Sequence, residues 1–186
     1  MTYLLIALAV AAAATPVVLT LAAVDDWSRD FSTNRAATNP DAQHAMMRPL
    51  TQRFTAEQVA EALADICRQQ SAWRMPDPPK PLPEDSPLPA DGALAVHHLV
   101  RTTPIMRYRD DVWAVVEKHD DVPNGDGPDG DGQNGDGQNG GGKLRVHLES
   151  RSRLGKGDLG QNPRNIRELN GLLLVRLVIK APPAKP

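Results

Sequence analysis

Seven prolines lie between Pro76 and Pro89, and this run limits what the chain can fold into more than any other feature. Proline has a fixed φ and no N–H group, so no helix or central strand passes through a segment of this density. We expect residues 76–91 to form a semi-rigid connector with polyproline II character. The regular elements must therefore lie on either side of it.

A second break covers residues 119–142, which are rich in Gly and Asp and repeat the unit Gly-Asp-Gly-Gln-Asn twice from Gly130 to Asn139. This composition predicts a disordered insert within a hairpin. Asp129, Asp131 and Gln133 do not continue into the EF-hand pattern, which also needs a Glu at its twelfth position. We therefore predict no metal site here or elsewhere in the chain.

The remaining segments carry patterns of both helix and strand. Thr55 and Gln58 match a capping box, and apolar residues follow them at helical spacing to about Gln70. The single cysteine, Cys67, lies in this helix; it excludes an internal disulfide, and we expect it to be buried. Trp73 and Met75 are compatible with a short strand.

Three longer strands are predicted over residues 93–103, 112–118 and 144–154, and Arg109, Asp110 and Asp111 are predicted to form a turn. In the last strand Leu144, Val146 and Leu148 alternate with polar residues, which indicates one buried and one solvated face. We expect one small α+β domain over residues 52–180, with an antiparallel sheet of about four strands and two helices packed on one face.

The second helix is predicted to begin with Asn162 as N-cap and Pro163 as its first residue. It would extend to about Val178. A short helix followed by a strand over residues 172–179 is the alternative, because the composition of that segment is strand-like. Residues 181–186 would form a tail.

The N-terminal residues 4–24 form a run of 21 uncharged, largely apolar residues. A bilayer core requires about 20 such residues. The absence of a basic flank and the length of the run favour a membrane anchor over residues 1–24, and a cleaved signal peptide remains the alternative. Residues 25–51 would be a polar lead-in. Its acidic start predicts a domain outside the cytoplasm, anchored or exported.

Charge is unevenly distributed along the chain. Residues 143–186 hold ten basic and three acidic residues, a balance of +7, whereas residues 120–142 hold six Asp and no base. Such asymmetry indicates partners rather than fold. With two Phe, two Tyr and three Trp, the chain has no aromatic platform for single-stranded nucleic acid, which we do not expect it to bind.

Gly155, Gly157 and Gly160 match the pattern G-x-G-x-x-G. A dinucleotide fold also needs a parallel crossover and an acidic residue about 20 positions on, and the chain has too few residues after this point. We predict no cofactor and favour a strand-to-helix turn. The same geometry would suit an anion at a helix N-terminus. The candidate anion-binding residues are Arg151, Arg153, Lys156, Asp158, Asn162 and Arg164.

The segments VRTTPIMRYRDDVWAVV and LRVHLESRSRLGKGDLGQNPRNIREL together resemble the bacterial family called domain of unknown function 1499. The resemblance covers roughly residues 51–174, apart from the connector and the insert. It implies a membrane-attached or exported protein and transfers no activity. The matching motif consists of Ser150, Ser152, Arg153, Gly155, Asp158, Gly160, Asn162 and Asn165, with Arg164 near the arginine position.

Three functional hypotheses follow. The first is a non-enzymatic envelope module that binds a small anion or an anionic lipid headgroup at the 151–167 loop, with membrane contact through residues 4–24. The second is a hydrolase or transferase that acts on an anionic envelope substrate, with Asp158 as base and Arg153 and Arg164 as an anion clamp, and it requires Asp158 to face a pocket. The third is a structural interaction protein in which the loop is only scaffold.

Overall fold

The computed structural model describes residues 2–22, 32–104, 106–119 and 143–179. These residues contain a six-stranded antiparallel sheet with the order β1-β6-β5-β4-β3, in which β2 also pairs with β6. The sheet is larger than the four strands predicted. Its strands are β1 (Arg35–Ala37), β2 (Leu50–Gln52), β3 (Trp73–Arg74), β4 (Ala93–Thr102), β5 (Arg109–Lys118) and β6 (Leu144–Ser152).

The additional strands are short and lie at the edges. β1 and β2 come from the segment that was expected to be a polar lead-in, and both pair with β6, through Ala36 opposite Ser150 and Thr51 opposite Arg145. Strands of three residues leave no periodic pattern in a sequence, because two alternations are too few to recognise. Their pairing depends on β6, which is distant in the chain.

The predicted helices are present. α3 (Ala56–Gln69) begins with the predicted capping box, in which the Gln58 N–H donates to Thr55 Oγ1 at 3.2 Å and the Thr55 N–H donates to Gln58 Oε1 at 2.8 Å. α4 (Gln161–Leu174) continues as a π-helical turn, η2 (Val175–Ile179), so the alternative of a C-terminal strand is wrong. A 3-10 turn, η1 (Ala45–Met47), precedes β2.

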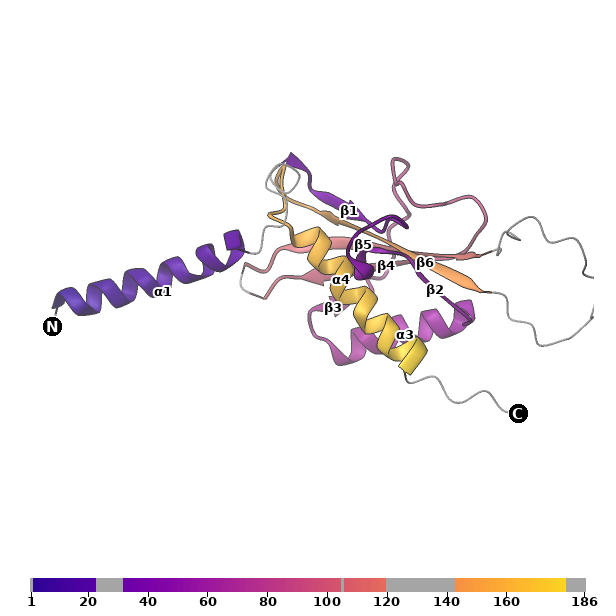
Figure 1. The fold of residues 1–186 in the computed structure, drawn as a ribbon, viewed down its shortest axis with the longest axis horizontal. Coiled ribbons are helices and arrows are strands. Elements are labelled where there is room, and N and C mark those ends of the chain that lie inside the picture. The colour runs from indigo at the N-terminus through magenta and orange to yellow at the C-terminus, as the bar shows by residue number, and fades with distance from the viewer. Residues whose placement is uncertain (1, 23–31, 105, 120–142, 180–186) are drawn as a thin grey trace, which may run out of the picture.

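α3 and α4 pack on one face of the sheet, as predicted (Figure 1). The core between them joins residues such as Leu63 and Leu169 from the helices to Val112 and Leu148 from the strands, all fully buried. Cys67 packs at the margin of this core as a free thiol, and burial raises its pKa. The helices therefore cover only one face of the sheet, and another segment packs on the second face.

That cover is the proline-rich segment, residues 76–91, which we call the proline strap. Lys80, Ser86 and Leu88 of the strap contact or lie buried against the second face, which carries the buried Trp113 and Glu149. The expectation that this face of β6 would be solvated is therefore wrong: Glu149 is fully buried. The sheet is covered on both sides, by helices on one and by irregular chain on the other.

The predicted turn at Arg109–Asp111 is also wrong, because β5 begins at Arg109 and pairs Asp110 with both Arg101 and Ser152. Asp110 and Asp111 are buried on opposite faces of the sheet. The turn between β4 and β5 lies earlier, over residues 103–108. β5 and β6 flank the Gly/Asp insert as predicted, and the insert itself, residues 120–142, lies outside the described residues.

The N-terminal apolar residues form α1 (Thr2–Ala22). No described helix has the combination of length and apolar character that a membrane span requires.

Candidate functional site

The loop between β6 and α4, residues 153–160, is closed by its own aspartate. Asp158 Oδ1 accepts a hydrogen bond from the Gly160 N–H at 2.9 Å, and Oδ2 accepts one from the Asn162 N–H at 2.7 Å. Gly160 has a φ of 73°, which glycine adopts without strain, and it is the N-cap of α4. Asp158 therefore satisfies the free backbone donors of the helix N-terminus.

Two predictions fail for this reason. α4 begins at Gln161 after Gly160, so Asn162 is inside the helix and is not its N-cap. Asp158 has both carboxylate oxygens engaged with backbone donors, so it is not the exposed base that the hydrolase or transferase hypothesis requires. That hypothesis is contradicted at its central residue.

Asn162 is fully buried and connects three segments. Its Oδ1 accepts from Ser150 Oγ at 2.6 Å, and its Nδ2 donates to the Asn34 carbonyl oxygen at 2.6 Å. One turn later, Asn165 Nδ2 donates to Asp110 Oδ2 at 2.9 Å and to Ser150 Oγ at 3.1 Å. This network ties α4 to β5 and β6, and it accounts for Ser150, Asn162 and Asn165 as structural members of the motif.

On the strap side of the sheet, the Asp111 carboxylate is surrounded by hydrogen-bond donors, and we call Lys80, His98, Asp111 and Arg153 the Asp111 cluster. Asp111 Oδ2 accepts from Arg153 Nε at 2.9 Å and from Lys80 Nζ at 2.8 Å. Its Oδ1 accepts from Arg153 Nη2 at 2.5 Å and lies 2.8 Å from His98 Nε2. Burial alone would raise the pKa of Asp111, but these hydrogen bonds outweigh burial and hold it well below its usual value.

The hydrogen bonds of the His98 ring define its tautomer. Its Nδ1 accepts a hydrogen bond from the Lys80 N–H at 2.9 Å, so Nε2 carries the proton that is donated to Asp111. The ring also stacks on Trp113, with centroids 5.2 Å apart. With both nitrogens engaged and the side chain buried, His98 positions the strap rather than transferring protons.

A second ionic group lies beside the first, and we call it the Arg35–Arg151 cluster: Arg35, Asp85, Ser86, Glu149 and Arg151. Arg151 Nε donates to Glu149 Oε1 at 2.5 Å and its Nη1 to Asp85 Oδ1 at 2.7 Å, while Arg35 Nη1 donates to Asp85 Oδ2 at 3.0 Å. Ser86 Oγ donates to Glu149 Oε2 at 2.5 Å. Burial would lower the pKa of Arg151, but Asp85 and Glu149 raise it overall.

The six predicted site residues therefore separate. Arg151 and Arg153 lie in two neighbouring ionic clusters, whereas Asp158 and Asn162 close the turn. Arg164 Nη2 donates back to the Leu159 carbonyl oxygen at 3.0 Å. Lys156 is exposed on the loop. Sequence patterns missed the strap residues and Asp111. The available signal was the two-residue spacing of Asp111, Trp113 and Val115, which places Asp111 on the same strand face and so begins the strand before residue 112.

Lys156 belongs to a different surface, at the end of the sheet. Thr102 lies opposite Arg109, and Asp110 lies opposite Ser152, so the turn 103–108 and the loop 153–160 lie at the same end (Figure 1, left end of the sheet). Three large apolar side chains there are strongly exposed: Leu154 at 68%, Met106 at 63% and Tyr108 at 48%. We call these three residues, with the exposed Arg107, Arg109 and Lys156, the sheet-end rim.

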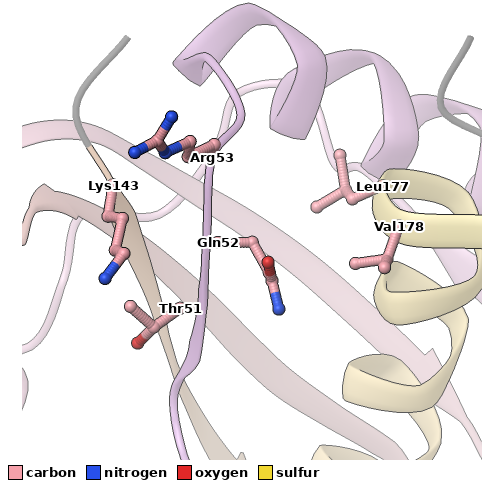
Figure 2. A pocket seen from close by; sticks show the side chains of 6 residues that line it. All are labelled: Thr51, Gln52, Arg53, Lys143, Leu177 and Val178. Atoms are coloured by element: carbon pink, nitrogen blue, oxygen red, sulfur yellow. The ribbon is translucent and has the colours of Figure 1, made fainter. Parts of the chain in front are cut away.

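An open pocket of about 340 Å³ lies at the opposite end of the sheet, where Gln52 pairs with Leu144. Figure 2 shows Arg53 and Lys143 on one side of it and Leu177 and Val178 on the other. None of the predicted site residues lines this pocket. Among the described residues no group of three or more His, Cys, Asp or Glu side chains is placed to hold a metal ion.

The fold and these clusters define a small α+β domain whose sheet carries helices on one face and a polar strap on the other. Residues 24–173 match the family model described as protein of unknown function (DUF1499), and the chain belongs to this family. The match confirms the resemblance seen in the sequence and begins before β1. No curated protein and no solved structure matches the chain significantly.

Proposed function

We propose that the protein is a non-enzymatic module that works at an extracytoplasmic membrane surface and contacts anionic lipid headgroups through the sheet-end rim. The observation that carries this proposal is the gathering of three exposed apolar and three exposed basic side chains at one end of the sheet. Monomeric soluble domains seldom expose such side chains together without a partner.

The chain enters the domain at this end. The Ser152 N–H donates to the Asn34 carbonyl oxygen at 2.8 Å, and Asn34 Nδ2 donates to the Gly155 carbonyl oxygen at 3.3 Å. Asn34, near the start of this part of the described chain, therefore lies beside the loop that carries Lys156. The uncharged run of residues 4–24 favours delivery to a membrane, as an export signal or as an anchor, and an anchor would bring the rim close to the lipid surface.

The composition of the rim suits the headgroup region. A Lys or Arg close to an anionic leaflet contributes about 1 kcal/mol, so three basic residues would contribute about 3 kcal/mol at low salt. Tyr108 has an apolar body with a polar tip, which favours the interface. An attraction of this size is reversible by itself and becomes stable together with a second membrane contact.

The charged groups that resemble catalytic machinery support a non-enzymatic role. The Asp158 carboxylate caps α4, and both ring nitrogens of His98 are engaged. These contacts are those of a scaffold that holds the loop and the strap in place.

The test uses the full chain in nanodiscs of phosphatidylcholine, with or without phosphatidylglycerol, followed by hydrogen exchange. We expect slower exchange over residues 103–109 and 153–160 only in the anionic discs, and loss of this protection at high salt because exposed charges are screened. Lys156→Glu should weaken the protection. Lys118→Glu is the matched control, because Lys118 is an exposed lysine at the far end of β5.

Equal protection in both kinds of disc would contradict the proposal. So would an equal loss in the two variants, because a general change in net charge rather than the rim would then explain the binding.

A further inference from the structure

Arg35 and Arg151 lie directly opposite one another in the β1–β6 ladder, so their side chains project from the same face of the sheet. Like charges placed in this way destabilise a sheet unless an anion lies between them. The fold therefore places two guanidinium groups side by side at a position that requires a negative partner.

In this structure the partner is Asp85 of the proline strap. One carboxylate oxygen accepts from Arg151 at 2.7 Å and the other accepts from Arg35 at 3.0 Å. Asp85 lies outside the sheet, in a turn closed by the Ser86 N–H, which donates to the Pro83 carbonyl oxygen at 3.0 Å. Arg35 Nη1 also donates to the Asp85 backbone carbonyl oxygen at 3.2 Å. Its side chain is 70% exposed, so the carboxylate lies between the arginines and the solvent.

Asp85 leaves part of this site unused. Arg151 Nε is bonded to Glu149 and Nη1 to Asp85, but Nη2 is buried and has no hydrogen-bond partner in the described part of the chain. Buried donors of charged groups are nearly always bonded, and an unpaired one calls for an explanation. A carboxylate that is free to rotate can occupy two donors of one guanidinium, which a carboxylate tethered to the strap does not do here.

The neighbouring strap residue extends the pattern. Ser86 Oγ donates to Glu149 Oε2, so a hydroxyl group fills the position next to the carboxylate of Asp85. Glu149 is fully buried and lies two residues from Arg151 on the same face. The pair Asp85–Ser86 thus presents a carboxylate and a hydrogen-bond donor to an arginine pair and a buried carboxylate.

We propose that Arg35, Arg151 and Glu149 form a binding site for a small carboxylate ligand with an adjacent hydroxyl or amino group, and that Asp85 and Ser86 occupy it as an internal substitute. The ligand binds by displacing residues 83–88 of the strap, while Lys80 keeps its contacts with Asp111 and His98. This site is independent of the proposed lipid contact, since it lies on the strap face and not on the sheet-end rim.

The experiment removes the internal competitor from the full chain. Asp85→Asn keeps the size of the side chain and removes its charge, and thermal unfolding is followed as lactate is added at constant ionic strength. A tethered group competes at an effective concentration in the millimolar range or above, so half-saturation should fall about tenfold or more relative to the unaltered chain. Glu84→Gln is the matched control, because Glu84 is the exposed neighbouring carboxylate and is not a member of the Arg35–Arg151 cluster.

Further variants and a second ligand test whether the proposed residues form the site. We expect Arg35→Gln or Arg151→Gln, combined with Asp85→Asn, to abolish the saturable shift; Arg35 is on a short edge strand, so its variant tests the site even if Arg151→Gln does not fold. Propionate, which lacks the hydroxyl group, should bind more weakly than lactate.

Three results would overturn the inference. They are a shift in Asp85→Asn no larger than in Glu84→Gln, an unchanged shift in the arginine variants, or tighter binding of inorganic phosphate than of lactate. Equal binding of propionate and lactate would overturn the role of Glu149.

Discussion

Asp111 accepts hydrogen bonds from both Nε and Nη2 of Arg153, at 2.9 and 2.5 Å, although the two residues are 42 positions apart in the chain. The pair joins the start of β5 to the residue that follows β6. Lys80 adds a contact from the strap at 2.8 Å. One carboxylate therefore fixes three segments that have no local reason to meet.

Arg153→Gln should lower the free energy of unfolding by about 2 kcal/mol, because it leaves a buried carboxylate with fewer charged donors. Lys80 and His98 remain in place, so the chain should still fold. Urea unfolding followed by Trp fluorescence measures the change. Arg53→Gln, at an exposed arginine, should change stability by less than about 0.5 kcal/mol. Equal effects of the two variants would refute the role of the pair.

Asp111 should also shape the response of the protein to acid. Its pKa is lowered in the folded state, so its contribution to stability is complete above the unfolded value of about 3.9 and is lost as the pH falls below it. Asp111→Asn lacks this contribution at every pH. The stability difference between the two proteins should therefore be largest near neutral pH and shrink below about pH 4. A difference that is constant with pH would contradict the ionic role of Asp111.

Asn162→Ala should be among the most destabilising single changes, at about 3 kcal/mol, because the buried Ser150 Oγ would lose its acceptor and the Asn34 carbonyl oxygen would lose one of its two donors. Gln52→Ala, at an exposed amide, is the control. Chemical denaturation compares them. If Asn162→Ala were as stable as Gln52→Ala, the hydrogen bonds of Asn162 would not contribute to stability and the prediction would be wrong.

Asp158→Ala should cost about 1 kcal/mol, the usual value of a lost helix cap. Asp158→Asn should cost less, since an amide oxygen still accepts one of the two N–H groups. The order of the two melting temperatures provides the readout. If both variants were as stable as the unaltered chain, the capping role of Asp158 would be wrong.

Substitution of His97 should raise stability, whereas the substitutions above should lower it. Burial lowers its pKa, and its buried Nε2 has no hydrogen-bond partner among the described residues. The unfolded chain therefore takes up the proton first, and stability falls as the pH drops below about 6.5. His97→Leu should remove this loss and raise stability by about 1 kcal/mol near neutral pH. Part of the pH dependence should persist, because burial also lowers the pKa of His147. A variant less stable than the parent at both pH 5 and pH 7 would contradict this.

The elements that could be predicted are those whose signals are local. Thr55 and Gln58 satisfy one another across one helical turn, so α3 is fixed by neighbours in the sequence. The alternation of Leu144, Val146 and Leu148 likewise locates β6 and its core face. Such signals need no knowledge of the rest of the fold.

The failures are residues whose partners are distant. Arg109, Asp110 and Asp111 have the composition of a turn, but they begin β5. Asp110 and Asp111 are buried there because Asn165 reaches the first, and Lys80 and Arg153 reach the second, from elsewhere in the chain. The segment containing Arg151 and Arg153 stays a predicted site, but local pattern could not show that these arginines pair with Asp85 and Asp111. The partner of a charged residue cannot be predicted from local sequence when that partner is distant in the chain.

The closing bond between β5 and β6, in which the His119 N–H donates to the Lys143 carbonyl oxygen at 2.8 Å, holds the two ends of residues 120–142 together. The Gly- and Asp-rich composition of this insert predicts a flexible loop, and doubling the length of such a loop costs only about 0.6 kcal/mol. Deletion or expansion of the five-residue repeat should therefore be almost neutral for folding, so this position can accept a reporter domain. A ten-residue strand such as β5 is about 33 Å long, which would place that reporter far from the sheet-end rim.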